Sequence, residues 1–351
     1  MFCTISLILL AFFMVESSKL CSHQCLCYDA SNIVDCRSRK FTHIPHTIPH
    51  GTWFLDLREN KLAELKTTSF SGIWALQILL LSTNDIQVLQ SQALSSLSFL
   101  ERLDLSHNKL QLLPLDFSEG LTSLKNLQLD HNALEHLKTP SLEHLESLEK
   151  LDLSHNYIQV IDVGTFHGLS CLRYLNLAWN RLTVLQGGLL TMQQGLSILL
   201  LGHNNISSIE TEALSPLKSL TFLGLEANQL ESLKFKTFLN LQTLGTHLQL
   251  SENPWTCNCE LHRVFNKILH VRHLHVDTYW NITCHAPHQL ADTSLALVDS
   301  HLCMGETATV LLICGTVMVT VVAALVMAER KRKEKKWMQG KHGSESEAPL
   351  T

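Results

Sequence analysis

The sequence predicts an α/β solenoid with a cysteine cap at each end, followed by one membrane-spanning helix. Three observations predict this architecture. The string "LDLSHN" occurs at residues 103–108 and again at 151–156, and looser relatives of it recur around both copies. Eight of the eleven cysteines lie in two sets of four that bracket these strings. An uncharged apolar stretch, residues 307–328, lies near the C-terminus.

The asparagine that ends each string sets the period of the solenoid. In "LERLDLSHN", Leu100, Leu103 and Leu105 are expected to point inward, while Arg102 and Asp104 alternate outward as in a short strand. A single strand of this kind has no core, so neighbouring coils must stack to bury their leucines. The spacing is constant throughout the series Asn60, Asn84, Asn108, Asn132, Asn156, Asn180, Asn204 and Asn228, and Asn253 follows one residue late.

The unit L-x-x-L-x-L-x-x-N-x-L resembles the leucine-rich repeat, and the resemblance covers residues 52–253. It implies a horseshoe with parallel strands on its concave face. The amide side chain of each asparagine can satisfy backbone groups left over in the bend after the strand, so we expect a structural ladder. A second inward column lies ten residues after the asparagines, at Phe70, Leu94, Leu142, Phe166, Leu190, Leu214 and Phe238. Phe117 comes one residue early, which predicts that its coil closes differently.

The two cysteine sets predict caps at residues 18–51 and 254–306. Each set of four allows three pairings, which the spacing alone leaves open. The sets resemble the disulfide caps of extracellular leucine-rich repeat proteins, the second one opening with "NPWTCNC". That resemblance implies the bonds Cys21–Cys27, Cys25–Cys36, Cys257–Cys284 and Cys259–Cys303. Zinc binding by these sets is disfavoured, because the targeting segments predict an oxidising compartment. We interpret Cys171, which lies between the two sets, as a buried small apolar residue.

Targeting segments lie at both ends of the chain. Residues 1–17 are typical of a signal peptide. Residues 307–328 would form a helix of about 33 Å, enough to cross a bilayer core. The positive-inside tendency then places residues 329–351 in the cytoplasm, which predicts a single-pass type I protein of the plasma membrane. The basic residues that set this orientation, and that are also candidates for binding anionic lipid, are Arg330, Lys331, Arg332, Lys333, Lys335 and Lys336.

Charge and short motifs narrow the function classes. The chain has a formal net charge of −5 although its tail is basic, so the predicted ectodomain is acidic, which argues against nucleic acid as a partner. Asn205 and Asn281 begin glycosylation sequons in the predicted exterior. The sequence has no G-x-S-x-G, H-E-x-x-H or phosphate-binding glycine loop. We therefore predict a non-enzymatic protein with no cofactor and no metal site.

Two groups of histidines are candidates for metal or pH-sensing sites. His107, His131, His155 and His203 each stand directly before a ladder asparagine, and Trp179 interrupts the column. We interpret these histidines as ordinary residues at an exposed position of the repeat. The segment "HVRHLHVD" in the second cap, with His270, His273 and His275, lacks cysteine or carboxylate ligands at a fixed spacing and is a weak candidate.

The outward strand positions predict a binding face. Most of them are polar, as a solvated sheet surface requires. Two groups, Ile78 with Leu80, and Ile198 with Leu200 and Phe222, are apolar where water is expected. Apolar clusters rimmed by polar groups tend to mark partner sites. We predict that these residues bind a partner protein on the concave face.

The order of segments resembles the small leucine-rich repeat transmembrane proteins, which include two functional branches. One branch contains adhesion and synapse-organising receptors, which bind partner ectodomains. The other contains gamma auxiliary subunits of large-conductance potassium channels. Our leading hypothesis is therefore recognition of another protein's ectodomain. The alternative is modulation of a membrane channel through residues 307–328 and 330–336.

Overall fold

The computed structural model describes residues 21–241, 243, 245–298 and 304–342, in two compact units. The first unit ends at Leu297 and the second begins at Val298, and each is described by itself. The first unit holds the repeats and both caps. The second holds one long helix.

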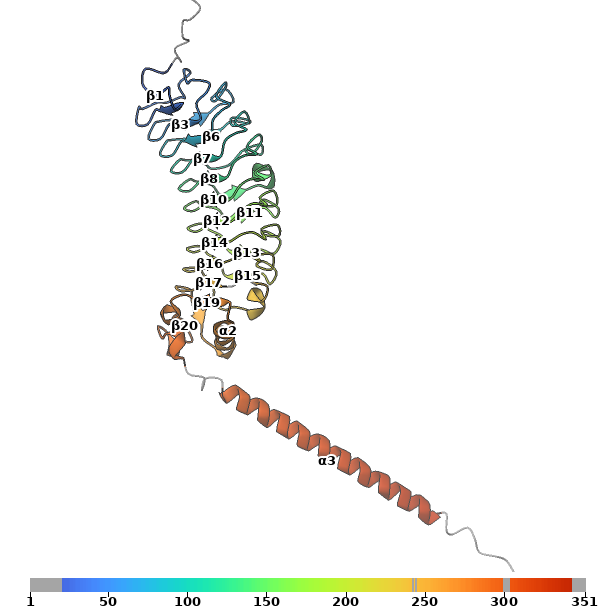
Figure 1. The fold of residues 1–351 in the computed structure, drawn as a ribbon. Coiled ribbons are helices and arrows are strands. Elements are labelled where there is room, and N and C mark those ends of the chain that lie inside the picture. The colour runs from blue at the N-terminus through green and yellow to red at the C-terminus, as the bar shows by residue number, and fades with distance from the viewer. Residues whose placement is uncertain (1–20, 242, 244, 299–303, 343–351) are drawn as a thin grey trace, which may run out of the picture. The chain divides into compact units, whose positions relative to one another are not determined.

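The repeats form a solenoid with one long sheet on the inner side of the curved stack (Figure 1). Apart from the antiparallel β1–β2 pair, its strands are parallel, and equivalent residues of neighbouring coils face each other, as Arg102 faces Asn126. The predicted leucine-rich repeat solenoid is thus confirmed. In spatial order the sheet contains β1 (Leu26–Tyr28), β2 (Ile33–Asp35), β3 (Phe54–Asp56), β5 (Ile78–Leu80), β7 (Arg102–Asp104), β8 (Asn126–Gln128), β10 (Lys150–Asp152), β12 (Tyr174–Asn176), β14 (Ile198–Leu200), β16 (Phe222–Gly224), β17 (Thr246–Gln249) and β19 (Leu274–Val276).

The ladder of asparagines holds successive coils together. The Nδ2 group of Asn108 donates to the carbonyl oxygens of Leu105 and, one coil earlier, Leu81, both at 3.0 Å. Its Oδ1 atom accepts from the amide of Ile86 at 3.0 Å. The same pattern recurs from Asn84 to Asn253. The predicted structural ladder is therefore confirmed, and each asparagine satisfies buried backbone groups of two coils.

The outer side of each coil carries shorter elements. Strand pairs form between β4 (Glu64–Leu65) and β6 (Val88–Leu89), β9 (His136–Leu137) and β11 (Val160–Ile161), and β13 (Val184–Leu185) and β15 (Ser208–Ile209). The 3-10 helices η1 (Thr139–Leu142) and η2 (Phe235–Phe238) replace other turns.

The second inward column packs as predicted, and one coil differs. Phe70, Phe166 and Phe238 are fully buried. The coil of Phe117, between β7 and β8, has no outer strand in the described structure, so it does close differently from its neighbours.

Disulfides close both ends of the first unit. Cys21 is bonded to Cys27 and Cys25 to Cys36 around the β1–β2 hairpin, as the resemblance implies. In the second cap, Cys257 is bonded to Cys284, and Cys259 is also oxidised. Its expected partner, Cys303, lies outside the described residues. The bonds hold together the two capping segments, which cover the leucines at the ends of the stack.

The second cap is built on α2 (Cys259–His270). Asn258 is the N-cap of this helix, and its side chain accepts a hydrogen bond from the Leu261 amide. The helix packs Phe265 edge-on against the buried Trp255. The remaining cap elements are β18 (Trp255–Thr256), η3 (Tyr279–Asn281), β20 (Cys284–Ala286), η4 (His288–Leu290) and η5 (Leu295–Leu297).

The interpretation of Cys171 as buried is wrong. Its side chain is exposed, although Leu169 and Leu172 on either side are buried. The chain turns there toward β12, and the equivalent position in two earlier coils holds serine, Ser123 and Ser147. The position is therefore at least partly open to solvent in these three coils.

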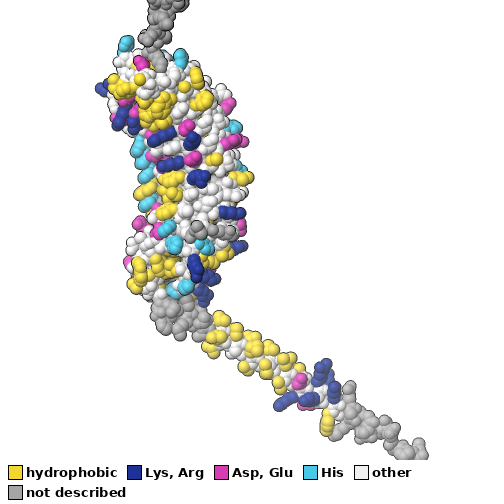
Figure 2. Space-filling view, viewed as in Figure 1, with side chains coloured by type: hydrophobic (Ala, Val, Ile, Leu, Met, Phe, Trp, Pro, Cys, Tyr) yellow, Lys and Arg dark blue, Asp and Glu magenta, His cyan; other side chains and the backbone are white. Residues whose placement is uncertain are grey.

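The second unit is the helix α3 (Met304–His342). It contains the predicted span 307–328, and its segment Val310–Met338 is long and apolar enough to cross a membrane. The basic residues from Arg330 to Lys336 continue the same helix (Figure 2). The predicted signal peptide and the end of the tail lie outside the described residues.

Candidate protein-binding surface

An apolar patch lies on the C-terminal part of the long sheet. Ile198 of β14 faces Phe222 of β16 in register, and Tyr174 of β12 faces Ile198 from the other side. Leu200 faces Gly224. Tyr174, Ile198, Leu200 and Phe222 are each half-buried, so apolar surface remains open to a partner. We call these four residues the C-terminal patch.

Tyr174 belongs to this patch although the sequence analysis left it out. The Lys150 ammonium lies 4.7 Å above the centre of its ring, a cation–π contact. Partial burial, followed by the charge of Asp152, raises the pKa of Tyr174, so the ring stays neutral at physiological pH. The register of outward positions could have identified it, because it stands one coil before Ile198 in the same column.

A half-buried carboxylate borders the patch at Glu226. A side-chain carbon on Gly224 would lie 3.0 Å from Glu226 Oε2 and 3.5 Å from a methyl group of Leu200. A side-chain carbon on Gly202 would overlap with Glu226 Oε1. The two glycines therefore make the space that the carboxylate occupies. Glu226 Oε2 is buried and has no hydrogen-bond partner among the described residues.

The N-terminal group differs from the prediction. Ile78 is half-buried, but Leu80 is only 7% exposed, so its interpretation as a surface contact is wrong. Leu80 faces Asp56 on one side and Asp104 on the other, and both carboxylates are themselves buried. Side chains on adjacent strands stand about 5 Å apart, so these neighbours cover the leucine.

The middle of the sheet is polar and internally bonded. Arg102 donates to Gln128 at 3.0 Å, and Asn176 donates to Asp152 at 3.2 Å. These bonds satisfy groups that would otherwise favour water or a polar partner. The apolar surface is therefore confined to the two ends of the face, and the C-terminal end offers more of it.

The histidine column forms a continuous stack along one edge of the repeats. Ring centres of His107 and His131 lie 4.1 Å apart, and those of His131 and His155 lie 4.2 Å apart. Trp179 does not interrupt the column: it stacks on His155 at 5.2 Å and on His203 at 3.8 Å. The indole is flat and fits the same spacing as an imidazole, which is why the sequence interpretation was wrong.

The backbone holds these rings in line. Each residue of the column has a left-handed conformation, with φ between 52° and 57°. Beside the stack, the Arg181 guanidinium lies 4.5 Å above the ring of Tyr157. Partial burial lowers the pKa of His155, and the neighbouring His131 acts in the same direction.

The histidines of the second cap are more dispersed. The Nδ1 atom of His270 is hydrogen-bonded to the carbonyl of Asn266. His275 lies beside His247, with ring centres 5.4 Å apart, and His247 pairs with Asp277 at 2.9 Å. His273 is half-buried. The segment 270–275 therefore does not gather its three imidazoles at one point.

The two sequons are accessible. Asn205 and Asn281 are both exposed, as are Ser207 and Thr283, which complete the triplets. Asn205 lies one coil after Arg181, beside the stacked edge. Glycosylation at both positions remains a prediction.

Comparison with known proteins identifies the repeat and the class. A family model described as "Leucine rich repeat" matches residues 54–110, 122–182 and 179–230. Amphoterin-induced protein 1 of Homo sapiens is 36% identical over 84 residues, which are 24% of this chain and 17% of that protein. The alignment thus spans less than a fifth of that relative.

Solved structures share the fold. The crystal structure of human 5T4, the trophoblast glycoprotein, has a TM-score of 0.62 at 24% identity and covers 82% of this chain and 99% of its own. A complex of Latrophilin 3, Unc5D and the FLRT2 leucine-rich repeats gives a TM-score of 0.57 at 22% identity, with 80% and 99% coverage. The fold defines a disulfide-capped solenoid. The chain contains leucine-rich repeats, and one apolar helix follows them in the sequence.

Proposed function

We propose that this chain is a non-enzymatic, single-pass protein of the plasma membrane, whose repeats bind the ectodomain of another protein. The observation that carries the proposal is the C-terminal patch. Four apolar or aromatic side chains meet there on a solvated sheet, at positions that the fold does not need for its core. Aromatic anchors of this kind often supply most of the binding energy of an interface.

The neighbouring charges indicate the chemistry of the partner. Glu226 places a carboxylate next to Leu200 and Gly224, and its buried Oε2 has no hydrogen-bond partner among the described residues. A partner that inserts an apolar side chain between Ile198 and Phe222 would complement this carboxylate best with a lysine or arginine beside it. The acidic balance of the ectodomain favours the same kind of partner.

The relatives are consistent with this role but leave the partner open. The FLRT2 repeats occur in a complex with other named proteins, Latrophilin 3 and Unc5D. At 22% identity this likeness supports the fold, and protein binding by the present chain rests on its own patch.

The direct test replaces the patch. We expect Leu200→Asp with Phe222→Asp to reach the cell surface normally and to abolish binding to partner-bearing cells, because both side chains point away from the leucine core. Gln128→Asp, at the position equivalent to Leu200 three repeats earlier, is the matched control and should bind normally. Normal binding by the aspartate pair would remove the patch from consideration.

The membrane topology is part of the proposal. Residues 1–17 would be removed as a signal peptide, 307–328 would span the bilayer, and 329–351 would face the cytoplasm. A tag after Thr351 should then be detected only after permeabilisation, whereas a tag after Ser18 should be accessible on intact cells. The reverse labelling would overturn the orientation.

Channel modulation is the competing function. It would depend on residues 307–328 and on the basic residues from Arg330 to Lys336. Replacing residues 307–351 by a lipid anchor separates the two functions. Ectodomain recognition should survive the replacement, and channel modulation should not.

A further inference from the structure

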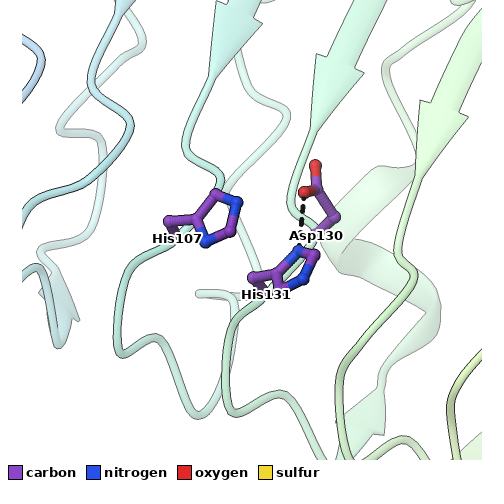
Figure 3. Close-up of side chains that lie close together, drawn as sticks. All are labelled: His107, Asp130 and His131. Carbon is purple, nitrogen blue, oxygen red and sulfur yellow. Dashed lines mark hydrogen bonds and ion pairs between the residues drawn. The ribbon is translucent and has the colours of Figure 1, made fainter.

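The stacked edge brings potential metal ligands together. His107 follows β7, His131 follows β8 at the equivalent position, and Asp130 directly precedes His131 (Figure 3). One ligand atom from each of the three lies within 4.8 Å of the other two. Within the described part of the chain, this is the one group of three such side chains that meets that spacing.

We propose that His107, Asp130 and His131 bind a divalent transition-metal ion, with zinc as the class of ion that fits. Imidazole nitrogens with one carboxylate oxygen are a common zinc donor set. Calcium and magnesium require mostly oxygen ligands, so they do not fit two imidazoles. A water molecule would complete the fourth position.

The backbone already holds the ligands at nearly the required separation. Parallel pairing of β7 with β8 fixes the two coils in register. His107 and His131 have nearly the same left-handed conformation, with φ of 52° and 54°. A tetrahedral ion with bonds of about 2.0–2.1 Å needs ligand atoms roughly 3.3 Å apart. Since no pair of ligand atoms is more than 4.8 Å apart, the group has to contract by at most about 1.5 Å.

Rotation of the imidazoles supplies that contraction. The two rings are stacked with an angle of 18° between their planes, so their nitrogens point side by side and do not converge. Both histidine side chains are exposed, and turning them gives up the stacking of His107 on His131 and of His131 on His155. The Asp130 carboxylate already contacts His131 Nδ1 at 3.0 Å and would exchange this hydrogen bond for the ion. Ion binding thus replaces a stack by a chelate without moving the backbone.

Two other histidine–carboxylate groups lack one part of this arrangement. His136 contacts Asp162 at 2.7 Å, and its side chain is 42% exposed, the same as that of His131. No second imidazole is recorded beside that pair in the described structure. His247 contacts Asp277 beside His275, but the two rings are 5.4 Å apart, wider than the 4.1 Å between His107 and His131. These groups serve as internal controls.

The histidine pattern alone does not predict this site. A column of imidazoles with no carboxylate favours an ordinary surface position. The motif "LQLDHN" places an aspartate before one histidine of the column, where "LDLSHN" places serine. The useful signal was that single difference between coils.

The test is zinc titration of the full-length protein in detergent by isothermal titration calorimetry. We expect the His107→Asn/His131→Asn double variant to lose one zinc equivalent. Asp130→Asn should weaken the same site about tenfold or more. Asparagine is chosen because it tolerates the left-handed backbone of the column. His136→Asn is the matched control and should leave the zinc titration unchanged. Titration with calcium should give no heat of binding with the unchanged protein or with any variant.

Several results would overturn the proposal. The double variant could bind zinc with the stoichiometry and affinity of the unchanged protein. Alternatively, the bound zinc equivalent could be lost in His136→Asn or in His247→Asn, which would place the ion at one of those histidines. Zinc should also raise the midpoint of thermal unfolding of the unchanged protein and of His136→Asn, but not that of the double variant. An equal rise in all three would likewise contradict the site.

Discussion

Leu80 and Leu200 occupy equivalent positions in two distant coils, yet they have different roles. Both are the last residue of a strand with the sequence Ile-Leu-Leu. Leu80 is buried, whereas Leu200 is half-buried on the candidate binding surface. The same residue at the same point of a repeat is thus core in one coil and surface in another.

The neighbouring strands explain the difference. On the far side of Leu80 lies Asp104, whose carboxylate accepts from the amide and hydroxyl groups of Ser106 and is buried over the sheet. At the equivalent place beside Leu200 lies Gly224, which has no side chain, and Glu226 partly fills the gap. The burial of a side chain in a solenoid therefore depends on the residues one coil away, as well as on its position within its own repeat.

The largest effect that tests this comparison is on stability. Leu80→Asp should lower the free energy of unfolding by about 3 kcal/mol or more, because it buries a carboxylate between Asp56 and Asp104. Leu200→Asp should cost less than about 1 kcal/mol, since water can reach the new carboxylate. Chemical denaturation followed by circular dichroism measures both. Equal losses for the two variants would contradict the assigned difference in exposure.

Binding should show the opposite order. Phe222→Ala should weaken partner binding by about 2 kcal/mol or more, roughly thirtyfold, if the C-terminal patch carries the contact. Ile78→Ala, in the same outward column at the N-terminal end, should change binding by less than about 0.5 kcal/mol. Titration of partner-bearing cells with each variant gives the two affinities. A stronger effect at Ile78 would move the binding site to the N-terminal end of the face.

The fold could be predicted from the sequence because its determinants are periodic and local. Asn108 and its equivalents bond to backbone groups of the preceding coil, so the constant spacing of the asparagines already encodes the ladder. The leucines between them alternate with outward-facing residues, as a strand requires. The disulfides of the first cap needed the family resemblance, because four cysteines alone allow three pairings.

The candidate sites were harder to predict because they depend on contacts between coils. The burial of Leu80 depends on Asp56, one coil before it, and on Asp104, one coil after it. Trp179 continues a stack of imidazoles only because the register aligns flat rings at one spacing. Glu226 fills space left by Gly202, again one coil away. Reading columns across repeats, residue by residue, recovers this information.

The next predicted effect is smaller, and it concerns the small residue beside each of the two leucines, Leu80 and Leu200. Gly202→Ala would place a carbon in steric overlap with Glu226 Oε1, so the carboxylate must shift. Because the displaced group is the end of a flexible side chain, the cost in stability should be below about 1 kcal/mol. Partner binding should weaken, since the charge beside the C-terminal patch moves. Ser82→Ala, at the equivalent position beside Leu80, is the control and should leave binding unchanged.

The smallest effect concerns pH and separates the central coils from the N-terminal ones. At the stacked edge the N-terminal coils carry Glu59 and Thr83, and the central coils carry imidazoles. The hydrogen bond from Arg37 lowers the pKa of the exposed Glu59 below its ordinary value of 4.5, so its contribution to stability is lost only in more acidic solution. Between pH 7 and about 5, the edge of the N-terminal coils should therefore not respond.

His155 should respond in that range. Partial burial, and then the charge of His131, lower its pKa below the ordinary value of 6.5, while Asp130 and Asp152 act in the opposite direction. Folded His155 thus binds a proton less readily than the unfolded chain does. Its contribution to stability is present above pH 6.5 and is lost as the pH falls through the lower, folded value. An NMR titration should place the His155 midpoint below 6.5, and His155→Asn should reduce the fall in stability on acidification. A midpoint above 6.5 would mean that the two aspartates outweigh burial in the stack.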